Sequence, residues 1–381
     1  MLKKVVLCML AGAVLMGSCL AAPEVPAPSC LLMDRATGTV LYEKNADEPL
    51  APASVTKVMT LLLVMEAIER GQLDWDDTVT ASAAAAAKGG SQVYLEEGEQ
   101  MSLREMVKCV VVSSANDCAT ALAEAVAGSE SGFVEKMNQR AKELGMEHTH
   151  FANCTGLDDE AGPEEHYTTA RDIAIMSRAL LQHDEIREFT TIWMDTIRDG
   201  AFGLSNTNKL VRFYQGTTGL KTGYTASAGY CMSASAERDG MELIATVMHC
   251  ESSTDRFESA KALLDYGFAA YRAAPVPLPQ ERPLQLKVKG STEETVPLDY
   301  AALPQTALLP AESAGQLTVQ LELPEVLEAP VTRGQTVGKA QLLCGEAVQG
   351  EYPVCAAADA PRMDFDTALQ LLWDSLRGVA A

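Results

Sequence analysis

The spacing of apolar residues along this chain changes from a strand-like period to a helical period and back, and that order limits the folds it can adopt. The first strand-like pair is joined through Gly38 and the last through Arg238-Asp239-Gly240, which are hairpin turn signals. The strand-like runs are residues 29–33, 39–43, 230–237 and 241–247, and the helical runs are residues 58–70 and about 103–144. Because strands lie at both ends and helices lie between them, we predict an α/β (α+β) domain over residues 29–272. Its antiparallel sheet is assembled from distant parts of the chain and flanked by helices.

A proline-rich stretch, residues 273–283, follows this domain and is predicted to be a linker. Beyond it, short strand-like runs separated by turns predict a small all-β domain over residues 284–358. Residues 362–381 are predicted to form an amphipathic helix with an apolar face made by Phe365, Leu369, Leu372 and Leu376. This face could contact a membrane surface or pack against a partner, and the sequence leaves both alternatives open. The acidic residues of the helix fit a surface of anionic lipid poorly.

The N-terminus has the order of a secretory signal. Two lysines precede an apolar run, residues 5–16, which is too short to span a bilayer, and small residues follow it. Cleavage after Ala21 would release a soluble chain, whereas a lipoprotein signal would place lipid on Cys19. In either case we predict that residues 1–21 are a signal peptide and that the protein is exported to the cell wall or the outer face of the cytoplasmic membrane.

Composition excludes some functions. The formal net charge of −22 argues against nucleic acid as a partner, since such a surface repels phosphates. The ten cysteines include no C-x-x-C pair, so we expect no metal site. Disulfide pairing is left open, because an exported chain permits it and the sequence does not specify partners. Cys109 and Cys231 lie in apolar runs and are expected to be small buried side chains.

Three short motifs carry the candidate chemistry, and they occur in one order. Ser54-Val55-Thr56-Lys57 is S-x-x-K, Ser114-Ala115-Asn116 is S-x-N, and Lys221-Thr222-Gly223 is K-T-G. Each is weak alone, but the order is that of penicillin-binding proteins and serine β-lactamases. Context supports them, because the first motif stands at the start of a long apolar helix and the third opens the second strand region.

The first motif suits nucleophilic catalysis. A serine hydroxyl is a weak nucleophile at neutral pH and needs a base, so Ser54 is the candidate nucleophile and Lys57 its base. Lys57 must be neutral for this role, and burial together with a second cation, Lys221, would lower its pKa. The N-terminus of the helix that follows Ser54 favours the negative charge that develops.

The other motifs supply the remaining roles. Ser114 can relay a proton between the lysines and the leaving amine. Asn116 can orient Lys57 and hold a substrate amide. Gly223 is expected to leave room for a substrate backbone along its strand.

The chain resembles the low-molecular-mass penicillin-binding proteins of the D-alanyl-D-alanine carboxypeptidase family. The resemblance covers residues 29–272, and residues 329–338 match the C-terminal domain of that family more loosely. The matching segments include residues 50–57, 114–119, 151–157, 206–210, 219–225 and 256–268. It implies the penicillin-binding-protein/β-lactamase-like transpeptidase fold, followed by a small all-β domain.

The resemblance also implies an activity and its site. The substrate would be a peptidoglycan stem peptide ending in D-Ala-D-Ala, from which attack by Ser54 releases D-alanine and leaves an acyl-enzyme. β-Lactams would acylate the same serine, and no metal or cofactor is expected. The backbone N–H groups of Ser54 and Tyr224 would form the oxyanion hole. Thr222, Thr225 and Arg256 would face the terminal carboxylate. Some relatives carry His at the place of Tyr224, so the role of its side chain stays open.

Three other functions remain alternatives. A DD-endopeptidase acting on peptidoglycan crosslinks uses the same constellation of residues. A class A β-lactamase needs a Glu for deacylation, and no E-x-x-L-N segment lies between Asn116 and Lys221. A non-catalytic wall-binding protein could keep the fold, but the intact motifs argue against it.

Overall fold

The computed structural model describes residues 22–158, 162, 164–279, 281–313 and 317–377. It divides into two compact units, Met1–Ala270 and Tyr271–Ala381. The predicted signal peptide, with Cys19, lies outside the described residues, and so does the side chain of Leu376. No helix in the described part of the chain combines the length and the apolar character needed to cross a membrane.

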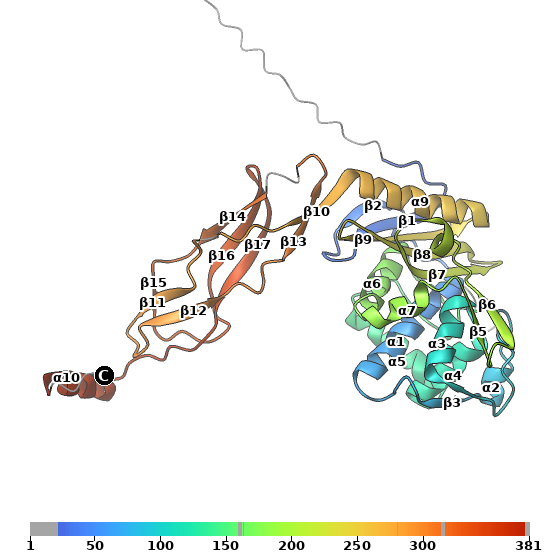
Figure 1. Cartoon of the computed structure of the whole chain (residues 1–381), viewed down its shortest axis with the longest axis horizontal. Helices are drawn as coiled ribbons and strands as arrows, with labels where there is room; N and C mark the ends of the chain where they lie inside the picture. Colours follow the sequence, from blue (N-terminus) through green and yellow to red (C-terminus); the bar gives the residue numbers. More distant parts are fainter. Residues whose placement is uncertain (1–21, 159–161, 163, 280, 314–316, 378–381) are drawn as a thin grey trace, which may run out of the picture. The chain divides into compact units, whose positions relative to one another are not determined.

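A five-stranded antiparallel sheet forms the centre of the first unit, and its strands come from both ends of that unit (Figure 1). The strands are β1 (Ser29–Asp34), β2 (Val40–Lys44), β7 (Thr217–Thr225), β8 (Gly229–Arg238) and β9 (Met241–Cys250). Their spatial order is β2-β1-β9-β8-β7, so the first hairpin joins the last one where β1 pairs with β9. This confirms the predicted fold class. It also makes β7 an edge strand, with one side free of strand partners.

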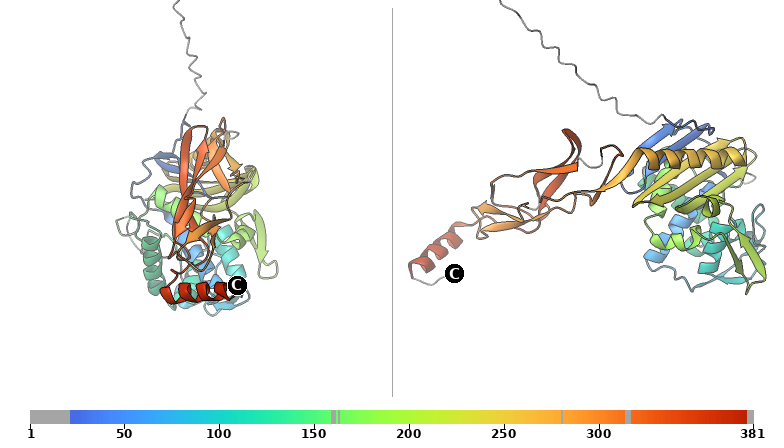
Figure 2. Two further views of the ribbon diagram at one scale, coloured as in Figure 1. Left: turned by 90° about the vertical axis from the view of Figure 1, so that its left-hand side faces the viewer. Right: turned by 45° about the horizontal axis from the view of Figure 1, so that its top comes forward.

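Helices cover both faces of this sheet (Figures 1 and 2). Helix α9 (Ser253–Ala270) packs on one face, against β8 and β9. Helix α6 (Ala170–Leu180) contacts β1 and β9 on the opposite face, and α1 (Lys57–Glu69) packs against α6. The shorter helices of the first unit are η1 (Ala53–Thr56), α2 (Ala83–Ala86), η2 (Asp184–Ile186), α7 (Arg187–Thr190) and α8 (Leu210–Phe213). Two small two-stranded sheets accompany them: β3 (Thr78–Thr80) pairs with β4 (Gln100–Ser102), and β5 (Met194–Ile197) pairs with β6 (Phe202–Ser205).

Helix α1 lies at the centre of the helical layer. It is buried on nearly all sides, from Lys57 to Met65, which is the behaviour of a helix that is apolar all round. The predicted helix over residues 58–70 is therefore confirmed within one residue at each end. The first residue of this buried helix is a lysine, and its burial decides the chemistry of the site.

The long helical run predicted over residues 103–144 is three helices in the structure. These are α3 (Leu103–Val112), α4 (Asn116–Ala127) and α5 (Glu130–Glu143). The first break contains Ser114 at a φ of +62°, and the second contains Gly128 at a φ of +78°. A positive φ cannot continue a right-handed helix, so the chain turns at both places. The first break places the S-x-N motif at the start of α4.

The second unit is built from strands. Its six-stranded sheet has the order β14-β16-β17-β12-β11-β15, and a separate pair joins β10 to β13. The strands are β10 (Tyr271–Pro275), β11 (Gln285–Lys289), β12 (Thr295–Asp299), β13 (Thr306–Pro310), β14 (Leu317–Glu322), β15 (Val326–Glu328), β16 (Thr336–Cys344) and β17 (Ala347–Ala356). Helix α10 (Phe365–Leu376) follows them. The start of the predicted linker is therefore a strand, and Val276 packs in the core beside Leu303 and Ala307. Proline is compatible with β10 because this strand has a partner on one side only.

Candidate active site

The S-x-x-K motif folds into a short turn that leads into α1. Ser54 lies in the 3₁₀ turn η1, and Lys57 is the first residue of α1. The Nζ of Lys57 donates to Ser54 Oγ at 2.9 Å and to the carbonyl oxygen of Thr155 at 2.7 Å. The expected pairing of serine and lysine is therefore present. The group that holds the lysine, however, is a backbone carbonyl rather than Asn116.

Burial controls the charge of both lysines. Lys57 is fully buried, and desolvation lowers its pKa to about 7. Lys221 is 1% exposed, and its pKa lies well below its usual value, first because of burial and then because Lys57 and Arg256 repel its charge. Burial is the dominant cause for Lys57 itself. A lysine with a pKa near 7 is partly neutral at physiological pH, so it can accept a proton.

The S-x-N motif presents two buried oxygen atoms without partners. No described residue makes a hydrogen bond to Ser114 Oγ or to Asn116 Oδ1. The Nδ2 of Asn116 donates to the Gly89 carbonyl at 2.7 Å, which fixes the direction of its amide. Buried polar atoms without partners are costly unless a ligand satisfies them. Asn116 Oδ1 can therefore accept from a substrate N–H, and Ser114 can donate or relay a proton.

A buried carboxylate supports this motif, and the sequence analysis did not single it out. Asp117 accepts hydrogen bonds from the backbone N–H groups of Val93, Leu95 and Cys118. It is 0% exposed and lies directly after Asn116. Asp117 thus ties residues 93–95 to the start of α4. The only sequence signal for it was its place inside the familial segment 114–119.

The K-T-G motif lies on the edge strand β7, directly against the nucleophile turn. A Cβ on Gly223 would stand 2.8 Å from the Pro52 carbonyl oxygen and 3.0 Å from the backbone nitrogen of Ser54. Glycine is therefore required here so that the strand can approach Ser54, and its expected second role, leaving room for a substrate backbone, stays a prediction. Lys221 Nζ donates to the Thr222 carbonyl at 2.9 Å, which holds the ammonium group inside the site.

The residues expected around a terminal carboxylate divide into two groups. Side chains alternate along a strand, so Thr222 and Thr225, three positions apart, point to opposite faces of β7. Thr222 Oγ1 donates to Thr207 Oγ1, whereas Thr225 Oγ1 accepts from the Ala228 N–H inside the turn between β7 and β8. The two hydroxyls therefore have different surroundings in the unliganded site, and the expectation that both face one terminal carboxylate stays a prediction.

Arg256 and Tyr224 complete the rim of the site. Arg256 is 7% exposed and donates to the Gly223 carbonyl at 3.1 Å. The Tyr224 side chain is 56% exposed and stacks on Tyr230, with ring centroids 4.3 Å apart. The guanidinium of Arg256 lies over the Tyr230 ring at 5.4 Å. Tyr224 therefore shields the side of the strand on which Arg256 lies.

A buried histidine supports the nucleophile turn through a hydrogen bond. Thr56 Oγ1 donates to the Ala53 carbonyl, so it accepts from His166 Nε2 at 2.8 Å. The other ring nitrogen of His166 accepts from the Ala152 N–H. Burial lowers the pKa of His166 to about 4, so the ring is neutral at pH 7 and this tautomer is set by its partners. Sequence analysis did not single out His166 or Thr155, because neither belongs to the three motifs; the only signal for Thr155 was its place inside the familial segment 151–157.

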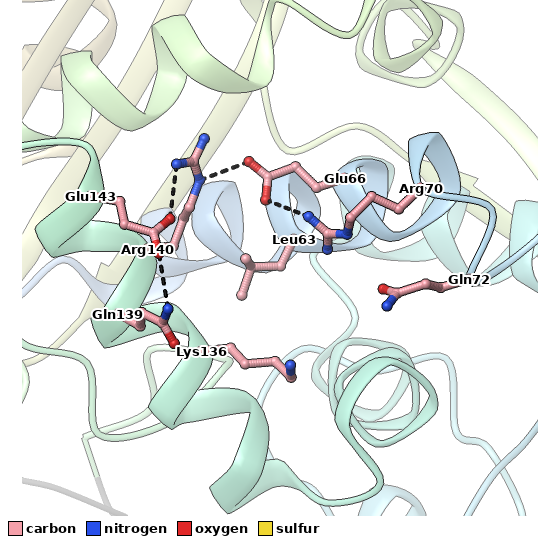
Figure 3. Close-up of a pocket in the computed structure, with 8 residues that line it drawn as sticks. All are labelled: Leu63, Glu66, Arg70, Gln72, Lys136, Gln139, Arg140 and Glu143. Atoms are coloured by element: carbon pink, nitrogen blue, oxygen red, sulfur yellow. Dashed lines mark hydrogen bonds and ion pairs between the residues drawn. The ribbon is translucent and has the colours of Figure 1, made fainter.

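A surface hollow elsewhere in the first unit does not belong to this site (Figure 3). It lies between the second half of α1 and α5, and four of its charged side chains form ion pairs with one another. Arg140 contacts Glu66 and Glu143, and Arg70 contacts Glu66. None of the candidate site residues lines it. The cluster around Ser54 is therefore the candidate active site.

A serine contacted by a buried lysine one turn later, beside a K-T-G edge strand, defines the class of serine hydrolases that use the S-x-x-K motif. Comparison with known proteins narrows this class. The family model described as D-alanyl-D-alanine carboxypeptidase matches residues 17–252, and the model of the penicillin-binding protein 5 C-terminal domain matches residues 280–362. The chain belongs to the D-alanyl-D-alanine carboxypeptidase family.

Individual relatives agree with this assignment. The carboxypeptidase DacF of Bacillus subtilis is 39% identical over 347 residues, which are 90% of this chain and 88% of the relative. The carboxypeptidase DacC of Escherichia coli is 35% identical over 83% of this chain and 80% of its own length. Penicillin-binding protein 5 of Haemophilus influenzae has a TM-score of 0.80 at 28% identity, covering 90% of this chain and all of that one (100%). The protein is therefore a serine carboxypeptidase, a hydrolase of the cell wall, and peptidoglycan and β-lactams fit it as substrate and ligand.

One solved relative carries a drug. Penicillin-binding protein D2 of Listeria monocytogenes has been solved in an ampicillin-bound form, with 33% identity and a TM-score of 0.58, covering 64% of this chain and 98% of that one.

Proposed function

We propose that Ser54 is the nucleophile of this carboxypeptidase and that Lys57 is its base. One observation carries the proposal: a fully buried lysine with a pKa of about 7 has its Nζ 2.9 Å from the serine hydroxyl. Ser54 Oγ attacks the carbonyl carbon between the two D-alanines while its proton passes to Lys57. The backbone N–H groups of Ser54 and Tyr224 stabilise the oxyanion that forms.

Collapse of this intermediate releases D-alanine. The proton held by Lys57 passes through Ser114 to the leaving amine; Ser114 is buried, and no described residue engages its hydroxyl. The remaining acyl group is an ester on Ser54. Water then attacks this ester, Lys57 takes the water proton, and the proton returns to Ser54 Oγ as the ester breaks. Each proton removed is thus replaced, and the enzyme is regenerated.

The substrate lies along the free edge of β7. Its terminal carboxylate faces Thr222 and Arg256, since Arg256 donates to the carbonyl of Gly223, the residue after Thr222, and the Arg256 Nε has no partner among the described residues. Asn116 Oδ1 accepts from an N–H of the peptide on the other side of the scissile bond. Thr225 lies near the turn that follows β7.

The first test is acylation by a fluorescent penicillin, followed by mass spectrometry of the labelled peptide. We expect one adduct on Ser54 of the wild-type chain that is lost slowly, release of D-alanine from a D-Ala-D-Ala peptide, and loss of both by at least about 1,000-fold in Ser54→Ala. Ser91→Ala is the matched control, because the backbone carbonyl of Ser91 accepts from the Asn116 N–H while its side chain is exposed. An adduct that survives in Ser54→Ala would overturn the assignment. Rapid drug turnover would favour a β-lactamase, and a folded chain without any adduct would favour a wall-binding protein.

Export and a membrane contact through α10 complete the proposal. Residues 1–21 have the order of a secretory signal. In α10, Phe365 is 78% exposed, Leu372 59% and Trp373 55%, so the helix offers apolar side chains to an interface. An amphipathic helix of this kind can lie in the plane of a membrane surface.

This contact can be tested in cells that produce the protein. We expect the full chain in the membrane fraction, a variant ending at residue 363 in the soluble extracytoplasmic fraction, and a mature mass that begins at Ala22. If the shortened variant still sediments with membranes and its mass shows lipid on Cys19, the anchor is the lipid and the role of α10 is wrong.

A further inference from the structure

One carboxylate near the nucleophile turn, that of Asp158, has no part in the mechanism above. Asp158 Oδ2 accepts from Ser227 Oγ at 2.7 Å and from the Ser227 N–H at 3.4 Å. Asp158 follows the loop that carries Thr155, and Ser227 lies in the turn between β7 and β8. These segments are far apart in the sequence, so the bridge joins the loop that carries Thr155 to the turn after β7.

The bridge lies within reach of a bound stem peptide. The Thr155 carbonyl holds Lys57, and it lies three residues before Asp158. Gly223 packs on the backbone of Ser54, and it lies four residues before Ser227. Three or four residues span at most about 10–14 Å, and less through a turn. Gly156 lies only two residues before Asp158, and a Cβ there would stand 1.9 Å from the Ala53 carbonyl oxygen, so the backbone of Asp158 is within about 10 Å of the nucleophile turn.

The charged residues around the site favour one orientation of the bound substrate. We assign the terminal carboxylate to Thr222 and to the guanidinium of Arg256, which donates to the Gly223 carbonyl. Asp158 lies beside the turn that follows β7, is partly exposed, and uses only Oδ2 in its bridge to Ser227; no described residue donates a hydrogen bond to its Oδ1. A carboxylate at this place repels the terminal carboxylate of a peptide and attracts a cation, which favours one orientation of the substrate.

We propose that Asp158 is a specificity-determining residue, which selects stem peptides whose residue before D-Ala-D-Ala carries a side-chain ammonium group. The inference rests on the proposed function of Ser54. The Cα of that residue lies about 3.8 Å from the Cα of the first D-alanine, and a four-carbon side chain adds about 6 Å. Its ammonium group can thus reach the free oxygen of Asp158 while the scissile carbonyl stands at Ser54.

The test compares two soluble substrates that differ in one charge. These are Nα-acetyl-L-Lys-D-Ala-D-Ala, which has a free ammonium group, and its Nα,Nε-diacetyl form, which has none. We expect kcat/KM of the wild-type enzyme to be about fivefold higher for the free amine, the scale of one partly exposed charge pair. Asp158→Asn should lower the value for the free amine to that of the diacetyl peptide and leave the diacetyl value unchanged. Asp158→Glu should keep the preference.

Two further measurements separate specificity from a structural role. Raising the salt concentration should reduce the wild-type value for the free amine and leave the diacetyl value nearly constant, because salt screens exposed charges. This experiment needs no variant. Ser227→Ala, which removes one bond of the bridge but keeps the charge, should retain the preference.

Equal losses for both substrates in Asp158→Asn, or equal wild-type rates at low salt, would overturn the inference. Penicillin acylation of Ser54 distinguishes this failure from failure of the proposed function. If acylation is intact while the preference is missing, only the assignment of Asp158 is wrong. If acylation is also missing in the wild-type enzyme, the proposed function itself is wrong.

Discussion

Replacing Lys57 by methionine is expected to abolish acylation while leaving the fold close to its original stability. The methionine side chain fills a similar apolar volume but cannot accept the proton of Ser54, so the acylation rate should fall by about 1,000-fold or more. Stopped-flow measurement of penicillin acylation tests this. A rate within tenfold of the wild-type rate would show that Lys57 is not the base.

Stability should respond in a different way from activity. The folded pKa of Lys57 is about 7, against an ordinary value of 10.5, so the unfolded chain binds its proton more readily. The free energy of unfolding of the wild-type chain therefore rises with pH between about 7 and 10.5 through this group. Methionine removes that charge cost but leaves the Thr155 carbonyl without its donor, which costs about 1–3 kcal/mol. The two effects oppose each other, and urea unfolding at pH 7 should show a change below about 2 kcal/mol.

The pH profile of acylation adds a second test of the same residue. The wild-type rate should rise as pH increases through about 7, because only neutral Lys57 accepts the proton. Lys57→Arg should be inactive throughout, since a guanidinium stays charged. Lys142→Met is the matched control, because Lys142 is exposed on α5, and it should change neither activity nor the profile.

Gly156→Ala is expected to disrupt both the fold and the site. Gly156 has a φ of +83°, and a Cβ there would stand 1.9 Å from the Ala53 carbonyl oxygen and 2.8 Å from Thr56 Oγ1. The nucleophile turn would have to move, because the atom in the way belongs to its backbone. We expect a loss of about 3 kcal/mol or more in the free energy of unfolding and a loss of acylation by at least about 100-fold.

Gly145→Ala is the control that separates the steric clash of an added Cβ from the free-energy cost of placing alanine at a positive φ. Gly145 has a φ of +76°, but no atom lies within 4 Å of the Cβ that alanine would add. This variant should lose only about 1–2 kcal/mol and keep its acylation rate. If both variants lose the same free energy and Gly156→Ala still acylates normally, the contact between Gly156 and the nucleophile turn has no functional importance.

The sequence alone determined the class of fold and the centre of the chemistry. The change of hydrophobic period predicted a sheet built from both ends of the first unit, because apolar spacing directly reports which side of an element is buried. The three motifs predicted Ser54, Lys57 and Lys221, because this chemistry depends on particular side chains. Their order along the chain was enough to indicate one site.

Only the tertiary structure decided which groups support that centre. Thr155 holds Lys57 through its backbone carbonyl, a group that every residue carries, so its side chain gives no sequence signal. Thr222 and Thr225 have different hydrogen-bond partners, because side chains alternate along β7 and the turn after this strand offers a backbone N–H to Thr225. The bridge from Asp158 to Ser227 joins segments 69 positions apart, and such a distance is closed only when the sheet and the helical layer pack together.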